Sequence, residues 1–378
     1  MNILHTVNIY FVIPYFLGDQ LLFFKRKGYN EHIICSPSPE IEEYSISHGF
    51  QYEEIPILRK VSIKGDLAAI RKIRRYIKTH KINIVTGHTP KGALLGIIAA
   101  WLEKVPKRIY FRHGLVFETS HGTKRKILIA LDKITSKLAT HIINVSPSVA
   151  QRSLEENLNS PDKQFILHKG TCNGIPIHKF NKDILDITQI HSLQKELRLE
   201  NSFVIGYTGR LVKDKGIIEL IQAFKILRED YPFLKLLLVG MFEERDVLPT
   251  EMVDFIKNNS DIIHVGYVSY ESIEYYYALM DVFALLSYRE GFPTSALEAS
   301  AMNLPVITTK ATGCIDSIVE KETGLFVNHT IEEIVSALKY FIENESQKRV
   351  FGSAGREFVK NNFASEIIWK EIEKIYQQ

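Results

Sequence analysis

Two glutamates, Glu290 and Glu298, flank a short turn with seven residues between them. Glu290 comes before a predicted helix, and Glu298 lies just over one turn inside it. Carboxylates accept hydrogen bonds from hydroxyl groups, and sugars and riboses present such hydroxyls in pairs. The alternative is that Glu298 is a solvated helix residue and Glu290 caps the helix. The surrounding residues favour a binding role for both.

The turn between the glutamates predicts an anion-binding helix end. A predicted strand, Val282 to Leu286, runs into Gly291, and Pro293 sits near the first helical position, where its missing N–H costs nothing. The free N–H groups and the positive dipole end of this helix suit a diphosphate. The hydroxyl of Thr294 adds a donor.

A basic loop, Gly209-Arg-Leu-Val-Lys-Asp-Lys-Gly216, follows another predicted strand, Phe203 to Thr208. Arg210 can bind phosphate oxygens bidentately, and Lys215 supplies a point charge. The charge that develops on a departing diphosphate needs such compensation. A lone basic loop is usually only solvated, so this interpretation depends on the second anion-favouring helix start in the same domain.

The elements that position these residues alternate between strand and helix patterns, twice along the chain. This alternation predicts an α/β protein with two doubly wound, Rossmann-like domains that face each other across a cleft. Ligands of such sheets bind beyond the carboxyl ends of the strands. We expect a first domain over 1–170, a turn-rich linker over 171–185, a second domain over 186–350, and an amphipathic helix over 351–378 that packs back on the first domain.

The motifs carry a family resemblance. The Arg210/Lys215 loop, followed by Glu290-Gly-Phe-Pro-Thr, Glu298-Ala-Ser-Ala and Pro305-Val-Ile, resembles the retaining glycosyltransferases of the large family 4, which have the GT-B fold. The likeness covers most of the chain and is sharpest from Gly206 to Gly324. It implies that the second domain binds a nucleotide sugar and that the first lies on the acceptor side.

The resemblance also implies roles for individual residues. Arg210 and Lys215, with the adjoining Gly209, would bind the donor diphosphate. Glu298 would hold the ribose hydroxyls, and Glu290 the hydroxyls of the donor sugar near the reacting carbon. Backbone groups of the turn after Glu290 would meet the phosphates or the sugar: Gly291, Phe292, Pro293 and Thr294. A second segment, which contains Tyr267 and Val268, would pack against the nucleotide base.

In the first domain, Arg112-His113-Gly114 resembles the family's His-Gly turn, which implies that His113 is catalytic and lies near the donor sugar. His88 follows the predicted strand Ile82 to Thr86, and we expect it, with Arg112, on the acceptor side. A lone histidine is often structural, so that alternative stays open for both histidines. The Gly-rich turn of the family is reduced here to Leu17-Gly18-Asp19, and Gly18 is the remaining acceptor-side candidate.

No metal and no other cofactor are expected. The chain has no Asp-x-Asp pair to hold a divalent ion on the diphosphate, so Arg210, Lys215 and the helix dipole would meet the charge instead. Its three cysteines, Cys35, Cys172 and Cys314, are widely spaced and form no C-x-x-C pair, which argues against disulfides and structural zinc.

Charge is distributed unevenly: residues 1–150 hold 22 Lys and Arg against 11 Asp and Glu, although the whole chain is only +3. The run Arg71 to Lys78 would give a cationic helix face, which is either a solvated surface or a contact for anionic lipid headgroups. No nucleic-acid-binding motif is recognised. With no signal-peptide pattern and no apolar run longer than Ala93 to Leu102, we expect a cytoplasmic protein, peripheral at the inner face of the plasma membrane.

The sequence therefore predicts a retaining, metal-independent glycosyltransferase. It would move a hexose or N-acetylhexosamine from a nucleotide-diphosphate sugar, with UDP favoured, to a glycan or lipid-diphosphate-linked saccharide in surface-polysaccharide, capsule or lipopolysaccharide synthesis. The alternatives are a GT-B-fold epimerase or phosphorylase and a non-catalytic sugar-binding protein.

Overall fold

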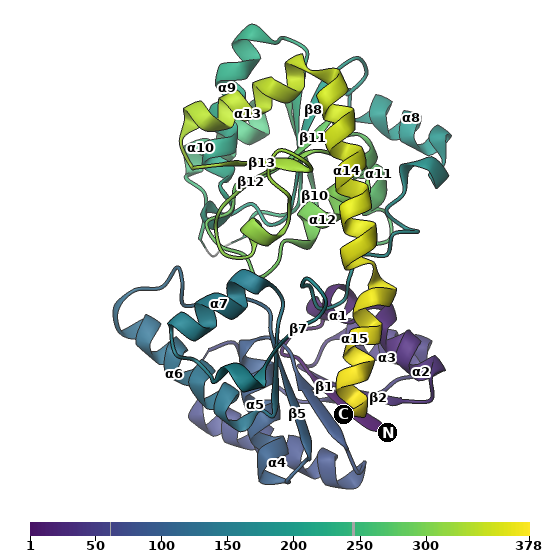
Figure 1. The fold of residues 1–378 in the computed structure, drawn as a ribbon, viewed down its shortest axis with the longest axis vertical. Coiled ribbons are helices and arrows are strands. Elements are labelled where there is room, and N and C mark those ends of the chain that lie inside the picture. The colour runs from purple at the N-terminus through teal and green to yellow at the C-terminus, as the bar shows by residue number, and fades with distance from the viewer. Residues whose placement is uncertain (61, 244–245) are drawn as a thin grey trace. The chain divides into compact units, whose positions relative to one another are not determined.

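The computed structural model describes residues 1–60, 62–243 and 246–378. The chain divides into two compact units, and each is described by itself (Figure 1). Unit 1 comprises Met1–Gly174 together with Ser365–Gln378, and unit 2 comprises Ile175–Ala364. Both are α/β units with a parallel sheet, as the alternation of strand and helix patterns predicts.

Unit 1 is built on a seven-stranded parallel sheet in the order β3-β2-β1-β4-β5-β6-β7. The order reverses between β1 and β4, which is the switch point where ligands of such sheets bind. The strands are β1 Asn2–Thr6, β2 Asn30–Cys35, β3 Gln51–Glu54, β4 Ile84–Gly87, β5 Lys107–Arg112, β6 His141–Asn144 and β7 Gln164–Ile166. The helices are α1 Val12–Phe16, α2 Asp19–Arg26, α3 Pro39–His48, α4 Ile63–Thr79, α5 Pro90–Leu102, α6 Gly122–Leu138, α7 Pro147–Glu155 and α15 Ser365–Gln377.

The local sequence of helix α5 determines where the helix begins and how closely it packs on the sheet of unit 1. The Thr89 side chain accepts a hydrogen bond from the N–H of Gly92, and Pro90 follows directly at the start of the helix. A Cβ placed at Gly96 would lie 2.2 Å from the hydroxyl oxygen of Thr6, so only glycine lets α5 pack this closely on β1. The close packing holds the carboxyl ends of β1 and β4 in a fixed relation.

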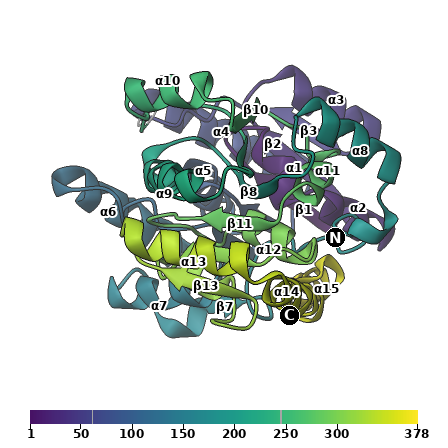
Figure 2. The ribbon, with the colours of Figure 1, turned by 90° about the horizontal axis from the view of Figure 1, so that it is seen from above.

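Unit 2 repeats the arrangement with six parallel strands in the order β10-β9-β8-β11-β12-β13, and its switch point lies between β8 and β11. Helix α9 lies next to α13, and α12 lies next to α14 (Figures 1 and 2). The strands are β8 Phe203–Thr208, β9 Leu234–Val239, β10 Ile262–Gly266, β11 Val282–Leu285, β12 Val306–Thr309 and β13 Gly324–Val327. The helices are α8 Ile187–Glu196, α9 Ile217–Asp230, α10 Thr250–Asn258, α11 Ile273–Ala278, α12 Thr294–Ala301, α13 Ile331–Glu343 and α14 Glu345–Phe363.

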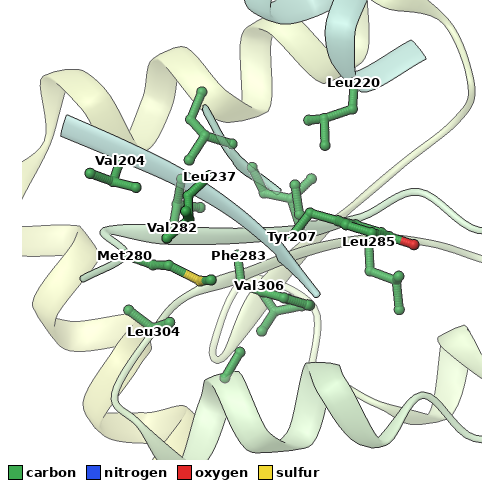
Figure 3. Close-up of a cluster of buried hydrophobic side chains, with 14 of the residues drawn as sticks. Val204, Tyr207, Leu220, Leu237, Met280, Val282, Phe283, Leu285, Leu304 and Val306 are labelled. Atoms are coloured by element: carbon green, nitrogen blue, oxygen red, sulfur yellow. The ribbon is translucent and has the colours of Figure 1, made fainter. Parts of the chain in front are cut away.

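The core of unit 2 lies between this sheet and its helices (Figure 3). Its central strands read as nearly continuous apolar runs, as expected for a sheet covered on both faces. Val282, Phe283 and Ala284 of β11 are fully buried, and Val306 of β12 packs beside them. Burying a side chain of this size stabilises the fold by about 1.5–3 kcal/mol. The core therefore fixes the strand ends from which the predicted donor-site loops start.

Two predicted boundaries need correction. The range 171–185 is not a free linker, because Ile175 and Phe180 are buried in the core of unit 2. The range 351–378 is not one helix either: α14 ends at Phe363 within unit 2, and α15 starts at Ser365 within unit 1. Helix α15 packs there through Trp369 on Phe23 and Tyr376 on Phe24. Across the part of the chain described, no helix has the length and apolar character required to cross a membrane.

Candidate functional site: strand ends in both units

The loops after β8 and β11 flank the switch point of unit 2, and they hold most of the predicted donor residues. Lys215 donates a hydrogen bond to a carboxylate oxygen of Glu290, with the two charged atoms 2.5 Å apart. The hydroxyl of Ser287 donates to the same oxygen at 2.9 Å. Both charged side chains keep some exposure, 13% for Lys215 and 17% for Glu290. A ligand can therefore reach this pair, which a fully buried pair would not allow.

Two glycines bring the backbone of these loops together. Gly216 has φ +69°, and a Cβ there would lie 2.2 Å from the carbonyl oxygen of Leu286. Gly313 has φ +80°, and a Cβ there would lie 2.5 Å from the carbonyl oxygen of Gly291. Both need the conformational freedom of glycine and the absence of a side chain. The predicted Lys215 and Glu290 meet because their loops approach through these contacts.

Arg210 differs from Lys215 in its surroundings. Its guanidinium forms an ion pair with Glu243 at 2.9 Å, and 49% of the Arg210 side chain is exposed. Such surface pairs contribute about 0–1 kcal/mol to stability, so the pair can open at little cost. Gly209 precedes it, and the Tyr207 hydroxyl donates to the Arg210 carbonyl at 2.7 Å. This hydrogen bond fixes the backbone of the loop, while the guanidinium stays accessible.

Glu298 is a buried carboxylate on α12. The hydroxyl of Tyr277 donates to it at 2.8 Å, and that hydroxyl also contacts the Thr208 hydroxyl at 2.6 Å. Burial raises the pKa of Glu298 to about 7, because the charged form loses solvent; the Tyr277 hydrogen bond and the charge of Lys179 oppose the shift. Glu298 is thus not the solvated helix residue of the alternative interpretation.

The remaining predicted donor residues lie around these loops. Pro293 is the N-cap of α12 and not its first residue, and it makes no side-chain cap hydrogen bond; the helix begins at Thr294. Phe292 packs on Phe363, with ring centroids 5.3 Å apart. Beyond β10, the Tyr267 side chain is 56% exposed, and Val268 packs partly buried against the core.

Three residues that organise this edge lie outside the predicted site: Tyr277, Thr208 and Ser287. Each contacts a predicted glutamate directly or through one hydroxyl. Tyr277 is fully buried 21 residues before Glu298, so no local spacing connects the two. The signal for Ser287 and Thr208 was available, because both are polar residues at the end of an apolar strand at the predicted binding edge.

In unit 1 the corresponding strand ends carry a chain of histidines. A ring nitrogen of His113 lies 3.0 Å from His88, which lies 3.3 Å from His5 in turn. The His113 ring stacks on Phe16 with centroids 3.9 Å apart. Burial lowers the pKa of His113 to about 3 and that of His88 well below its usual value, so both rings are neutral at pH 7.

His113 is partly exposed and can present a ring nitrogen to a ligand, whereas His88 is fully buried. The prediction that His88 lines the acceptor side is therefore wrong for direct contact, because its ring lies behind His113. Gly18 is the N-cap residue of α2 with φ +41°, and a Cβ there would lie 2.6 Å from the Pro14 carbonyl oxygen. Its backbone geometry explains a glycine at this position.

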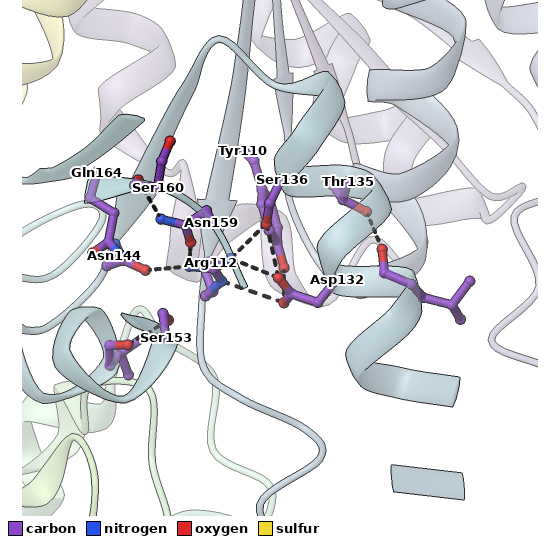
Figure 4. A network of polar contacts seen from close by, with 12 residues as sticks. Tyr110, Arg112, Asp132, Thr135, Ser136, Asn144, Ser153, Asn159, Ser160 and Gln164 are labelled. Carbon is purple, nitrogen blue, oxygen red and sulfur yellow. Dashed lines mark hydrogen bonds and ion pairs between the residues drawn. The ribbon is translucent and has the colours of Figure 1, made fainter. Parts of the chain in front are cut away.

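Arg112 is also misplaced by the sequence prediction. Its side chain is fully buried and forms an ion pair with Asp132 at 2.6 Å (Figure 4). The same guanidinium donates to Asn144 at 3.0 Å and Asn159 at 2.9 Å, and to the Ser136 hydroxyl at 2.7 Å. Every direction of the guanidinium fork is thus committed to unit 1 itself. Arg112 joins β5, β6 and α6 and does not contact an acceptor.

The geometry gives unit 2 the groups that an anionic, hydroxyl-rich ligand needs. The loop after β8 carries two partly exposed cations, Arg210 and Lys215. Glu290 lies on the loop after β11 and Glu298 on the helix that follows it, each with a hydroxyl donor. Cations compensate phosphate charge, and carboxylates accept hydrogen bonds from sugar hydroxyls. Among the described residues, no group of three or more His, Cys, Asp or Glu side chains is arranged to hold a metal ion.

Comparison with known proteins decides the family. The model of glycosyl transferase 4-like proteins matches residues 3–146, and that of glycosyl transferases group 1 matches residues 189–358. The capsular polysaccharide biosynthesis glycosyltransferase CapM of Staphylococcus aureus is 37% identical over 99% of this chain and 96% of its own. This chain belongs to the same glycosyltransferase family. The family resemblance seen in the motifs is confirmed.

Two further matches fit this glycosyltransferase family. The UDP-Gal:alpha-D-GlcNAc-diphosphoundecaprenol alpha-1,3-galactosyltransferase of Escherichia coli is 25% identical over 93% of this chain and 88% of its own. Anabaena HepE, solved in complex with UDP-glucose, superposes with a TM-score of 0.82 at 18% identity and covers 100% of both chains. The predicted GT-B fold is confirmed by this likeness. The rival interpretation as a non-catalytic sugar-binding protein finds no support in these matches.

Proposed function

We propose that this glycosyltransferase transfers a hexose or N-acetylhexosamine from a UDP-sugar, with retention of configuration and without a metal ion. The acceptor is a saccharide carried on a lipid diphosphate, within the assembly of a capsule or another surface polysaccharide. The observation that carries the proposal is the partly exposed Lys215–Glu290 pair at the switch point of unit 2, followed along the chain by the buried Glu298 of α12. The names of the CapM, Escherichia coli and HepE relatives support the donor and acceptor classes.

In the proposed reaction, Arg210 and Lys215 compensate the charge that develops on the leaving diphosphate. The bond between the anomeric carbon and the phosphate oxygen breaks, and a bond from the acceptor hydroxyl oxygen forms on the same face. The leaving phosphate oxygen takes the acceptor proton. Glu290 and Glu298 accept hydrogen bonds from hydroxyls of the sugar and the ribose. No side chain in this scheme acts as a covalent nucleophile.

The test is direct. The purified protein is incubated with UDP-glucose, UDP-galactose, UDP-N-acetylglucosamine and UDP-N-acetylgalactosamine in excess EDTA, with a synthetic saccharide diphospholipid as acceptor. We expect UDP release and one glycosylated product by mass spectrometry, with an α-anomeric coupling constant by NMR. Product formation only after a divalent metal is restored would overturn metal independence. A β-linked product from the α-linked donor would overturn retention, and turnover with GDP- or ADP-sugars alone would overturn the UDP assignment.

The proposal includes contact of unit 1 with an anionic membrane surface through α4. Arg71, Lys72 and Arg75 are exposed on this helix, while Glu103 pairs with Arg74 and Lys78. At the start of the same helix, Ile63 is 74% and Leu67 50% exposed. Basic residues near an anionic surface contribute about 1 kcal/mol each, and exposed apolar side chains add burial.

Sedimentation with vesicles tests this contact. The wild-type protein should bind vesicles that contain phosphatidylglycerol and not vesicles of phosphatidylcholine alone. Charge reversal by Arg71→Glu with Arg75→Glu should abolish binding. The matched control reverses two exposed lysines of unit 2, Lys182→Glu with Lys195→Glu, and should bind as wild type does. Equal losses in both double variants would reduce the effect to net charge and contradict a specific role of α4.

A further inference from the structure

Two buried ionisable side chains of unit 1, His5 and Glu31, have no part in the function described so far. Their ring nitrogen and carboxylate oxygen lie 2.7 Å apart, and both side chains are fully buried. His5 lies on β1 and Glu31 on the adjacent β2. A buried carboxylate costs several kcal/mol unless it is bonded, so such a pair at a strand end calls for a physical explanation.

The pair continues a line of side chains across four neighbouring strands, in the order β2, β1, β4 and β5. Glu31 contacts Nε2 of His5, and Nδ1 of His5 contacts Nε2 of His88 at 3.3 Å. Nδ1 of His88 contacts Nε2 of His113 at 3.0 Å. The hydroxyl of Thr86 bridges the middle, 2.7 Å from Nδ1 of His5 and 3.3 Å from Nε2 of His88. The line ends at the partly exposed His113.

Hydrogen-bond chemistry gives this line a direction. A carboxylate only accepts, and a neutral imidazole donates from one nitrogen and accepts at the other. If Glu31 accepts from Nε2 of a neutral His5, Nδ1 of His5 must accept. The Thr86 hydroxyl, the nearer partner of that nitrogen, then donates to it, and the Thr86 oxygen accepts from Nε2 of His88. Nδ1 of His88 therefore accepts, so Nε2 of His113 donates. This leaves Nδ1 of His113 as an acceptor. The same logic lets the aspartate of a Ser-His-Asp triad fix the tautomer of its histidine.

We propose that Glu31 and His5 are positioning residues that fix the tautomer of His113, so that its Nδ1 is unprotonated and accepts a hydrogen bond from a hydroxyl of the bound ligand. The role of His113 near the donor sugar is the one that the family resemblance implies, and it rests on the proposed function, but the tautomer itself is a property of unit 1 alone. Glu31 is the origin of the direction, because it is the only member of the line that cannot donate as a carboxylate.

Among the described side chains around Glu31, His5 is the one that donates a hydrogen bond to its carboxylate. Within the described residues, its second carboxylate oxygen is buried and has no hydrogen-bond partner, and the buried Tyr376 hydroxyl of α15 has none either. Other titratable groups facing this end are Tyr29, His32 and Tyr376, and Tyr76 and His80 lie beyond His32. Burial raises the pKa of Tyr376 well above its usual value and lowers that of His32 to about 4, so both stay neutral at pH 7.

The test reads the tautomers directly. Two-bond ¹⁵N–¹H correlation spectra of the full chain, with ¹⁵N-labelled histidine, distinguish a protonated from an unprotonated ring nitrogen. At pH 7 the wild-type His113 should show a protonated Nε2 and an unprotonated Nδ1. In Glu31→Gln, the amide can present either its oxygen or its NH₂ to His5, so both directions become populated and His113 should show mixed tautomers. Glu31→Asp keeps an acceptor-only group and should keep the wild-type tautomer.

Activity supplies the second readout. In Glu31→Gln, kcat should fall about tenfold while KM for the donor stays unchanged, since the wrong tautomer weakens the reacting geometry without removing donor contacts. Glu31→Asp should recover most of kcat. The matched control, Glu53→Gln, replaces an exposed carboxylate on the neighbouring β3 and should change neither readout.

Two results would overturn the proposal. A wild-type His113 with its proton on Nδ1 would show the opposite direction, whatever the variants do. A single, unchanged His113 tautomer in a folded Glu31→Gln would show that Glu31 does not set it. Because the spectra need no substrate, a correct tautomer together with an absent UDP-sugar activity would contradict only the proposed function. If Glu31→Gln does not fold, the wild-type spectrum alone still decides.

Discussion

The strand ends of the two units solve different problems with polar residues. In unit 2, Lys215, Glu290 and Arg210 form ion pairs that keep part of each side chain exposed. In unit 1, Arg112 and His88 are bonded on all sides and fully buried. Unit 2 thus holds charges that can be shared with a ligand, whereas these two side chains of unit 1 fix the structure of unit 1 itself. Substitution of these residues should therefore cost activity in unit 2 and stability in unit 1.

The largest effect on stability is expected for Arg112→Met. The side chain keeps similar bulk, but Asp132, the buried Asn144 and the half-buried Asn159 lose their partner, and breaking such a buried pair costs about 3–5 kcal/mol. Urea denaturation should show this loss, while kcat per folded molecule stays near that of the wild type. The control is Arg152→Met, whose surface pairs contribute about 1 kcal/mol or less. If Arg112→Met kept wild-type stability but lost turnover, this result would support the predicted role of Arg112 on the acceptor side.

The opposite pattern is expected for Lys215→Ala in unit 2. Removing a cation that meets the developing phosphate charge should lower kcat about 100-fold or more, with little change in the melting temperature. Lys213→Ala is the matched control, because Lys213 is exposed in the same short 3₁₀ turn, and it should keep wild-type activity. Steady-state kinetics and thermal melting check both variants. A large drop in the melting temperature of Lys215→Ala without a change in kcat would show that Lys215 has a structural role. The two units would then not differ in the way described.

The contrast also explains how far the sequence could predict this molecule. The sequence predicts Arg210, Lys215 and Glu290 as donor residues because they belong to two continuous segments, each starting at a strand end. Glycines with positive φ then bring these segments together, and glycine is visible in a sequence. The alternation of patterns likewise predicts two parallel sheets, although helix α3 and strand β3 contribute little to this pattern. Both elements carry few apolar residues, and β3 is a largely exposed strand at the sheet edge.

The polar line of unit 1 could not be found in that way. His5 and Glu31 are 26 residues apart, and His5 and His88 are 83 apart, so only the strand order brings them together. A weak signal existed: His5 is a polar residue inside the apolar strand Ile3-Leu-His-Thr. Arg112 was misassigned for the converse reason. It adjoins a recognisable motif at His113, but successive residues of a strand point to opposite faces, so its side chain points into unit 1.

The buried histidines of unit 1 should make stability sensitive to acid. Burial lowers the pKa of His113 to about 3 and that of His32 to about 4, against about 6.5 in the unfolded chain. Below pH 6.5 the unfolded state therefore binds more protons, and stability falls as the pH drops toward the folded pKa values. At pH 5 the loss is about 2 kcal/mol per histidine.

Urea denaturation at pH 7, 6 and 5 measures this loss. The variant His32→Gln should flatten the dependence by about 2 kcal/mol between pH 7 and pH 5, since one of the groups that must remain neutral is gone. The exposed His191 of unit 2 provides the control, His191→Gln, which should follow the wild-type curve. If stability had the same pH dependence in the wild type and both variants, protonation of the buried His32 ring would cost no stability.

The smallest predicted effect concerns the buried carboxylate of unit 2. Burial raises the pKa of Glu298 to about 7, so about half of the ligand-free molecules carry it protonated at that pH. Ribose hydroxyls donate to the ionised form, so UDP binding should tighten as the pH rises through 7 and level off above it. Between pH 6 and pH 8 the expected gain in affinity is about tenfold, and binding at pH 7 should release a fraction of a proton.

Isothermal titration calorimetry of UDP in buffers with different ionisation enthalpies measures both quantities at once. Glu298→Gln should remove the pH dependence and the proton release, leaving the affinity close to that of wild type at pH 6. Glu332→Gln, an exposed carboxylate of α13 in the same unit, should leave both unchanged. Wild-type binding that is flat between pH 6 and pH 8 would mean that Glu298 does not accept the ribose hydroxyls. The buried carboxylate would then resemble Arg112 of unit 1, whose hydrogen bonds all lie within its own unit.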